Sequence, residues 1–110
     1  MAWCQAASAV STRGAVLDPG FTGDPASELI NLDKAINEAI LVAPDGVGAD
    51  LARIVDWAVD INTELANGSD LPAAISRALE FADQTRLPAS VESLNQHLAA
   101  CGYPGIPATS

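Results

Sequence analysis

Few residues of this chain have the type and spacing that catalysis requires. Nucleophilic catalysis needs a nucleophile, a base and a group that orients the base, yet the 110 residues include one histidine, His97, and no G-x-S-x-G motif. His97 precedes Cys101 by four residues, a spacing that places two metal ligands on one helix face. A third ligand would have to come from a distant carboxylate. We therefore expect no enzyme, no metal site and no cofactor, and interpret His97 as a half-exposed helix residue.

A row of carboxylates is the other candidate for chemistry. Asp56, Asp60 and Glu64 follow one another at intervals of four residues. Such a row could bind a hard cation or pair two carboxylates for acid–base work. No calcium-loop glycine accompanies it, and a straight helix cannot surround calcium with six or more oxygens. We interpret the row as a solvated helix face, with Arg53 relieving part of its repulsion.

Charge and composition exclude several classes of partner. The chain has 14 acidic and 5 basic side chains, a net charge of -9. Binding to nucleic acid phosphates needs clustered Lys and Arg, so we expect no nucleic acid partner, and an anionic membrane surface would repel the chain. No apolar run approaches the ~20 residues of a transmembrane segment. A hydrophobic content of 49% with 17% charged residues predicts one packed domain.

Two cysteines stand near the ends of the chain. A disulfide between Cys4 and Cys101 would close a loop of ~97 residues and stabilise the fold by roughly 4–5 kcal/mol. We favour this pairing over two reduced, buried thiols. A disulfide requires an oxidising compartment, and residues 1–4 do not resemble a signal peptide. We expect an extracytoplasmic protein whose signal peptide has been removed; a cytosolic protein is the alternative.

Helical periodicity dominates the sequence. Apolar residues recur at intervals of three and four in successive segments, and alanine, the best helix former, occurs 21 times. The predicted fold class is all-α: a small four-helix up-down bundle with a short N-terminal helix tied to the C-terminal helix by the disulfide. The predicted helices span residues 2–12, 25–43, 46–67, 71–86 and 89–101, in one domain of residues 1–102.

Turn residues set the limits of these helices. Asp24-Pro25 is typical of a helix start, and Pro44 and Gly68 of helix ends. Leu87-Pro88 is expected to break the fourth helix. Residues 13–24 contain three glycines and are expected to fold onto the helices as a lid. Residues 103–110 are expected to form a flexible tail, ordered only where it packs on the body.

Large aromatic side chains mark a candidate surface. Trp57 and Phe81 lie off the best apolar stripes of their helices, and each follows an acidic residue. If exposed, they would form with Phe21 an interaction surface for a protein partner. The alternative is that the segment 13–24 or a neighbouring helix covers them.

Short motifs along the chain match one group of proteins. They are Cys4 near the start, Ala43-Pro44 before a long helix, Asp56-Trp57-Ala58 within it, and a terminal Ala100-Cys101-Gly102. With its alanine-rich, acidic composition, the chain resembles small secreted or lipid-anchored α-helical proteins of actinobacteria, largely of unknown function. This resemblance implies export and a disulfide, and it implies no catalytic residue.

The predicted function is a non-catalytic, extracytoplasmic interaction or structural module with a protein partner of unknown identity. One alternative is a carrier for a small ligand, a lipid or haem, held between the helices, with His97 or Tyr103 ligating iron. A second is an acidic cytosolic regulator that binds a basic protein partner through Asp56, Asp60 and Glu64.

Overall fold

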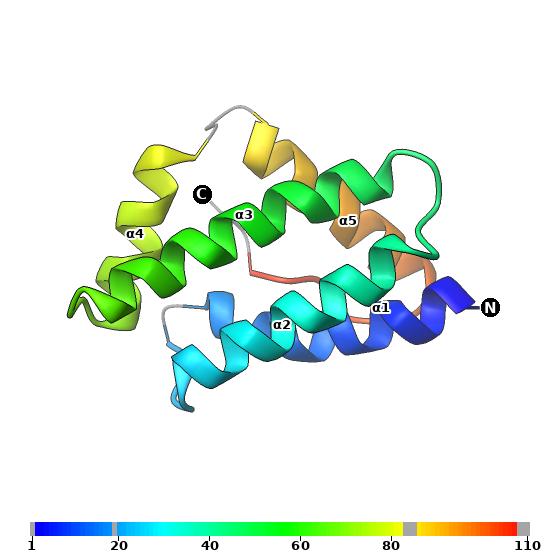
Figure 1. Ribbon diagram of the computed structural model, residues 1–110. Helices are drawn as coiled ribbons and strands as arrows, with labels where there is room; N and C mark the ends of the chain where they lie inside the picture. Colours follow the sequence, from blue (N-terminus) through cyan, green and yellow to red (C-terminus); the bar gives the residue numbers. More distant parts are fainter. Residues whose placement is uncertain (1, 19, 83–85, 108–110) are drawn as a thin grey trace.

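The chain is all-helical over the residues that the computed structural model describes, which are 2–18, 20–82 and 86–107. This confirms that the protein belongs to the predicted all-α class. The elements are α1 (Ala2–Arg13), the 3-10 helix η1 (Gly14–Leu17), α2 (Pro25–Ile40), α3 (Val47–Ala66), α4 (Leu71–Phe81) and α5 (Arg86–Ala100) (Figure 1).

Helix α3 is the centre of the fold. It packs against α2, α4 and α5, whereas α1 packs mainly along α2. Successive helices α1, α2 and α3 run antiparallel, and α4 and α5 share the remaining side of α3 (Figure 1). The predicted four-helix up-down bundle is therefore not confirmed. Helix α1 was expected beside α5, and its contacts with α5 are few.

The predicted pairing of the cysteines is confirmed. Cys4 on α1 and Cys101, directly after α5, lie at disulfide bonding distance, with their Cα atoms 5.5 Å apart. Because α1 otherwise touches α5 little, this bond is a principal link between the first and last helices.

The boundary between α4 and α5 corrects the sequence analysis. Helix α4 ends at Phe81, followed by an extended Ala82, and not at residue 86. Helix α5 already begins at Arg86, so Leu87-Pro88 opens this helix and does not break its predecessor. Proline is tolerated there because first-turn N–H groups have no intrahelical acceptor. Residues 83–85 lie outside the described residues.

The end of α2 and the start of α3 also differ slightly from expectation. Helix α2 ends at Ile40, three residues earlier than predicted. Residues 41–43 then form a tighter turn, in which each backbone N–H donates to the carbonyl three residues before it. Helix α3 follows from Gly46, whose φ of 85° lies in the left-handed region that favours glycine.

One hydrophobic core lies between the helices. Trp57, which the periodicity placed off the core stripe, is part of it and only 2% exposed. Helix α3 is covered by α2 on one side and by α4 and α5 on another. The buried face of α3 is therefore wider than the single row of apolar residues that the periodicity predicts, and it includes Trp57. The largest fully buried side chains include Leu32 and Ile36 of α2, Leu51, Ile54 and Ile61 of α3, and Leu94 and Leu98 of α5.

The segments outside the helices also pack on the body. Val16 and Leu17 are buried and Phe21 is half-buried, in agreement with the lid predicted over 13–24. The segment from residue 103 onward was expected to be ordered only where it packs on the body, and within it Ile106 is buried, at 4% exposed. Residues 108–110 lie outside the described residues. None of the helices formed by the described residues combines the length and apolar composition needed to cross a membrane.

Candidate functional site

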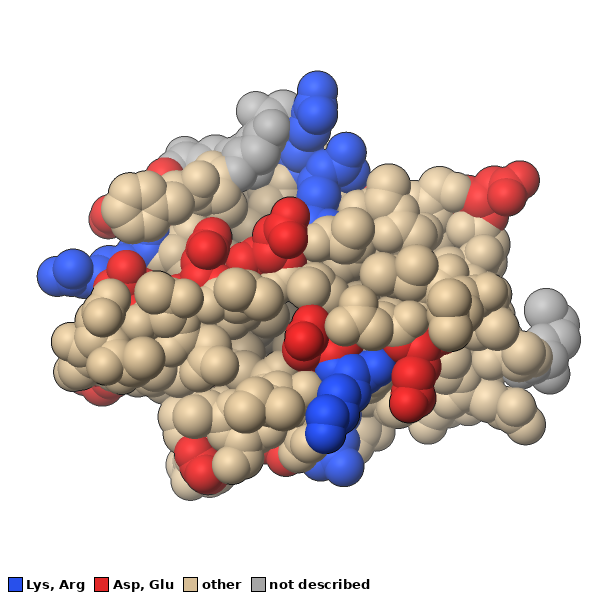
Figure 2. All heavy atoms as spheres, viewed as in Figure 1, with Lys and Arg blue, Asp and Glu red and all other residues tan. Residues whose placement is uncertain are grey.

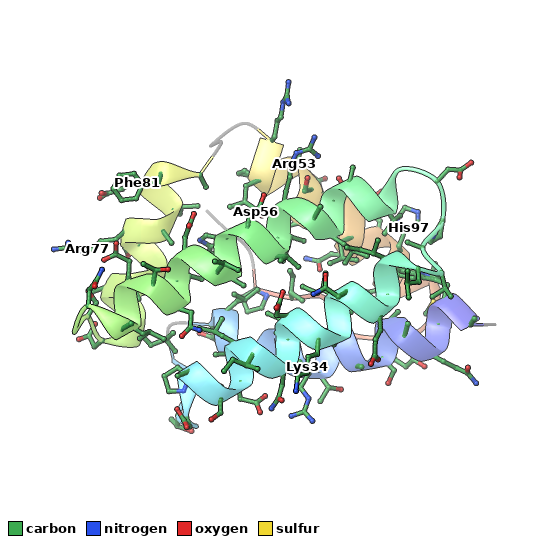
Figure 3. The ribbon with its side chains drawn as sticks, in the orientation of Figure 1. Lys34, Arg53, Asp56, Arg77, Phe81 and His97 are labelled. Atoms are coloured by element: carbon green, nitrogen blue, oxygen red, sulfur yellow. A yellow bond between two sulfur atoms is a disulfide. The ribbon has the colours of Figure 1, made fainter. Side chains whose placement is uncertain are left out.

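A cleft of about 260 Å³ lies where α4 ends and α5 begins. Helix α3 contributes Arg53, Asp56, Trp57 and Asp60 to its lining. The end of α4 contributes Phe81 and Ala82, and the first turn of α5 contributes Arg86 and Leu87. The cleft exists because two short helices, rather than one long helix, cover this side of α3. Figure 3 shows Arg53 and Asp56 on α3 and Phe81 on α4.

Trp57 lines this cleft, and its indole N–H is a buried hydrogen-bond donor without a described partner. Its side chain is nearly fully buried, and its indole Nε1–H finds no acceptor among the described residues. It is the only buried side-chain nitrogen or oxygen in the described part of the chain without a partner. A buried donor left unpaired costs about 1–3 kcal/mol, so such a group calls for a functional explanation.

Arg53 stands one helical turn before Trp57 and is held from two directions. Its Nη1 donates to the Ser90 hydroxyl of α5 at 3.2 Å and lies 3.7 Å from a carboxylate oxygen of Asp50. Ser90 is 1% exposed and is the only buried polar residue in the described chain. A guanidinium has five N–H donors, and both contacts use Nη1. Nε and Nη2 therefore remain to bind an acceptor.

The carboxylate row predicted from the sequence divides into two parts. Asp56 and Asp60 are exposed and line the cleft, and neither makes an ion pair with a described residue. Glu64 is half-buried and lies 4.0 Å from Arg77 of α4, outside the cleft. Figure 2 shows acidic side chains in a row over α3 beside α4. The row is thus a solvated face whose first two members also border the cleft.

Two of the three aromatic residues of the predicted interaction surface, Trp57 and Phe81, line the same cleft. Phe81 is 77% exposed at the α4 rim, and in Figure 3 its ring points from α4 toward solvent. Trp57 lies beneath the rim as a buried wall of the cleft. Phe21 is half-buried and does not line the cleft. Of the three, therefore, Phe81 alone is largely exposed.

The sequence analysis did not identify the cationic side of the cleft. Arg53 was noted only as a partner of nearby carboxylates, and Arg86 and Ser90 were not singled out. The spacing of four between Arg53 and Trp57 was a usable signal, since it places both on one face of a helix. Its meaning depends on the break between α4 and α5, which the sequence analysis misplaced.

His97 does not line this cleft. Its Nδ1 lies 2.9 Å from the Ser93 carbonyl oxygen, an arrangement in which Nδ1–H donates along the helix. Cys101 is committed to the disulfide. The described residues contain no group of three His, Cys, Asp or Glu side chains that could hold a metal ion.

Comparisons of the chain with protein families, with curated proteins and with solved structures find no match. The geometry of the cleft must therefore carry the functional argument.

Proposed function

We propose that this protein is a non-catalytic, extracytoplasmic binding module whose ligand occupies the cleft between α3, α4 and α5. The observation that carries the proposal is the cleft itself, which is lined by the exposed carboxylates of Asp56 and Asp60, without a described basic partner, and by the buried side chain of Trp57.

The disulfide supports the extracytoplasmic part of the proposal. Bonds of this kind persist in oxidising compartments and are rare in the cytosol. The resemblance to small exported helical proteins of actinobacteria agrees with this. The alternative of an acidic cytosolic regulator requires reduced cysteines, whereas Cys4 and Cys101 lie at bonding distance. Thiol titration of protein from its native compartment should find no free thiol before reduction, and two free thiols would contradict export.

Carriage of a small ligand is a second candidate function, favoured by the size of the cleft. Pockets that hold drug-sized ligands and cofactors have volumes of about 300–1,000 Å³ and a mostly apolar lining. This cleft measures about 260 Å³, and four of its lining residues are charged. The geometry therefore favours a small polar ligand over a lipid or haem.

The proposal is tested by following the indole signal of Trp57. The chain has two tryptophans, so Trp3→Phe leaves a single indole N–H resonance in a ¹⁵N NMR spectrum. Separate titrations would use amino acids, dicarboxylates, sugars, fatty acids and basic peptides. We expect one class to shift this resonance saturably. If no class shifts it at millimolar concentration, the cleft is not a binding site for these molecules and the proposal fails.

A pair of variants locates the binding. Ala82→Leu places a larger side chain in the cleft wall, where Ala82 is half-buried, and should weaken binding at least tenfold. Val59→Leu enlarges an exposed side chain of α3 that does not line the cleft and should leave binding unchanged. Equal effects of the two substitutions would place the ligand elsewhere.

A further inference from the structure

We infer that the face formed by α2 and α3 docks an amphipathic helix of a protein partner, one whose apolar side is bordered by lysine or arginine. This surface lies on the side of α3 that faces α2, away from the cleft, and goes beyond the proposed function. A groove between the two helices, the exposed apolar side chains along it and the charge of its borders support it.

A groove of about 50 Å³ lies between α2 and α3. It is lined from both helices, by Leu29, Ile30, Asp33, Ala58, Val59 and Asn62. Pockets for drug-sized ligands are much larger, about 300–1,000 Å³. The groove therefore suits a single side chain presented by a larger partner better than it suits a free small molecule.

Two large apolar side chains stand exposed on opposite walls of this groove. Ile30 of α2 is 50% exposed, and Val59 of α3 is 51% exposed. Exposed apolar side chains that are scattered singly are normal on a protein surface. These two line the same groove, so their accessible areas belong to one surface that a partner can cover.

A second apolar stripe on α3 extends this surface beside the stripe that enters the core. Gly48, Ala52, Val55 and Val59 follow one another at intervals of four, three and four residues, so they share one face of the helix. Ala52 and Val59 are exposed, and Gly48 and Val55 are half-buried. The stripe is about 16 Å long. Helices pack against one another through rows with these intervals, so the stripe suits a partner helix.

The charge at the borders of the surface favours a basic partner. Asp33 lies in the groove itself, and Asp56 and Asp60 directly follow Val55 and Val59 on α3. These three carboxylates make no ion pair with a described residue. In Figure 2, uncharged surface separates the acidic row over α3 from the charged side chains over α2. Lysine or arginine on both sides of a docked apolar stripe would therefore meet carboxylates.

A second copy of the chain is the alternative occupant, and charge opposes it. Each chain has a net charge of -9. A symmetric dimer through this face would bring the same patch of both copies together, including Asp33, Asp56 and Asp60. Like charges that face one another across an interface are unfavourable. A basic partner gains attraction at the positions where a second copy would be repelled.

Three model peptides test the inference. The first has ~18 residues, a length at which an isolated helix can form, with leucine and alanine on one face and lysine on both sides of it. The second replaces every lysine by glutamate, and the third scrambles the first, which removes the apolar face. Titration of the disulfide-bonded protein would be followed by ¹⁵N NMR of the backbone amides. We expect only the first peptide to bind saturably, with shifts centred on Ile30 and Val59.

Matched variants separate apolar docking from general attraction to an acidic protein. Val59→Glu and Phe81→Glu each remove an exposed apolar side chain and add a negative charge, but Phe81 does not line the groove. Val59→Glu should weaken the lysine peptide about tenfold or more, and Phe81→Glu should not weaken it. Ile30→Glu, on the opposite wall, should act like Val59→Glu. Because both residues are half exposed, these variants should fold, which circular dichroism checks.

Several results would overturn the inference. One is that the lysine peptide fails to bind at millimolar concentration, or that the scrambled or glutamate peptide binds as tightly. Another is tighter binding to both Val59→Glu and Phe81→Glu, which charge alone would produce. A third is a dimer in sedimentation equilibrium that Val59→Glu dissociates, because this face would then join two copies of the chain.

The inference and the proposed function can fail separately. Ala82→Leu changes the wall of the cleft and not the groove, so it should leave the affinity for the lysine peptide unchanged. A loss of affinity in this variant would place the peptide in the cleft and overturn the inference, while leaving a binding role for the cleft.

Discussion

The side chain of Asn95 pairs with the backbone of Ile106 through two hydrogen bonds. Asn95 Nδ2 donates to the Ile106 carbonyl oxygen at 3.1 Å, and Asn95 Oδ1 accepts from the Ile106 N–H at 2.8 Å. The Ser11 hydroxyl donates to the carbonyl of Pro104 at 2.6 Å. The segment 103–107 thereby connects α1 with α5, two helices that otherwise have few contacts.

Replacing Asn95 by alanine should release this segment. Both backbone groups of Ile106 lose their partner, and at about 0.5–1.5 kcal/mol for each hydrogen bond the free energy of unfolding should fall by about 1–3 kcal/mol. Urea denaturation measures the loss, and amide hydrogen exchange at Ile106 should become faster. The matched control is Gln96→Ala, an exposed neighbour on α5, which should change stability by less than about 0.5 kcal/mol. Equal stabilities of the two variants would show that the Asn95 pairing contributes nothing.

Gly14 packs against the same segment. A Cβ atom at this buried position would overlap Cγ2 of Ile106. Gly14→Ala should therefore lower the free energy of unfolding by about 1–3 kcal/mol, the usual cost of overpacking. Gly48→Ala, whose Cβ would meet nothing within 4 Å, should be neutral or stabilise α3 by about 0.5–1 kcal/mol. In an Ile106→Ala background the cost of Gly14→Ala should shrink; an unchanged cost would place its origin elsewhere.

The sequence predicts the local structure of this protein better than its packing. The helix starts at Pro25 and Leu71 follow from a proline in the first turn of each helix, and at Leu71 also from Asp70, whose side chain accepts from the Ala73 N–H. The break near residue 82 could not be predicted, because Pro88 could either end one helix or stand in the first turn of the next. In the structure it stands in the first turn of α5. Ile106 packs through contacts with Asn95 and Gly14. These residues are distant in the sequence from one another or from Ile106, and hydrophobic periodicity does not predict such contacts.

The candidate site was only partly predictable for the same reason. Asp56 and Asp60 were recognisable as an acidic row, and Trp57 as an unusual aromatic residue. That they share a cleft with Arg86 depends on how α4 and α5 divide one side of α3. The burial of Trp57 likewise requires that α3 be covered by three other helices.

Removing the disulfide should have the largest effect on stability. The bond joins residues separated by 97 positions, for which the chain-entropy estimate is about 4–5 kcal/mol. Reduction of the native protein should lower the urea midpoint by a corresponding amount. The double variant Cys4→Ala/Cys101→Ala should resemble the reduced protein and should not respond to reductant. An unchanged midpoint after complete reduction would contradict a stabilising role for this bond.

Substitutions of Trp57 should separate the role of its ring from that of its N–H group. Trp57→Phe keeps an aromatic ring in the core and removes a donor that has no described acceptor. The smaller ring of phenylalanine lowers the free energy of unfolding. This loss is offset because the variant no longer buries an unpaired donor, which costs the parent protein about 1–3 kcal/mol. We expect the free energy of unfolding to stay within about 1 kcal/mol of the parent protein, whereas Trp57→Ala should lose about 3–5 kcal/mol. Urea denaturation without added ligand measures both values. A loss in Trp57→Phe as large as that in Trp57→Ala would mean that the indole N–H is already satisfied within the folded protein.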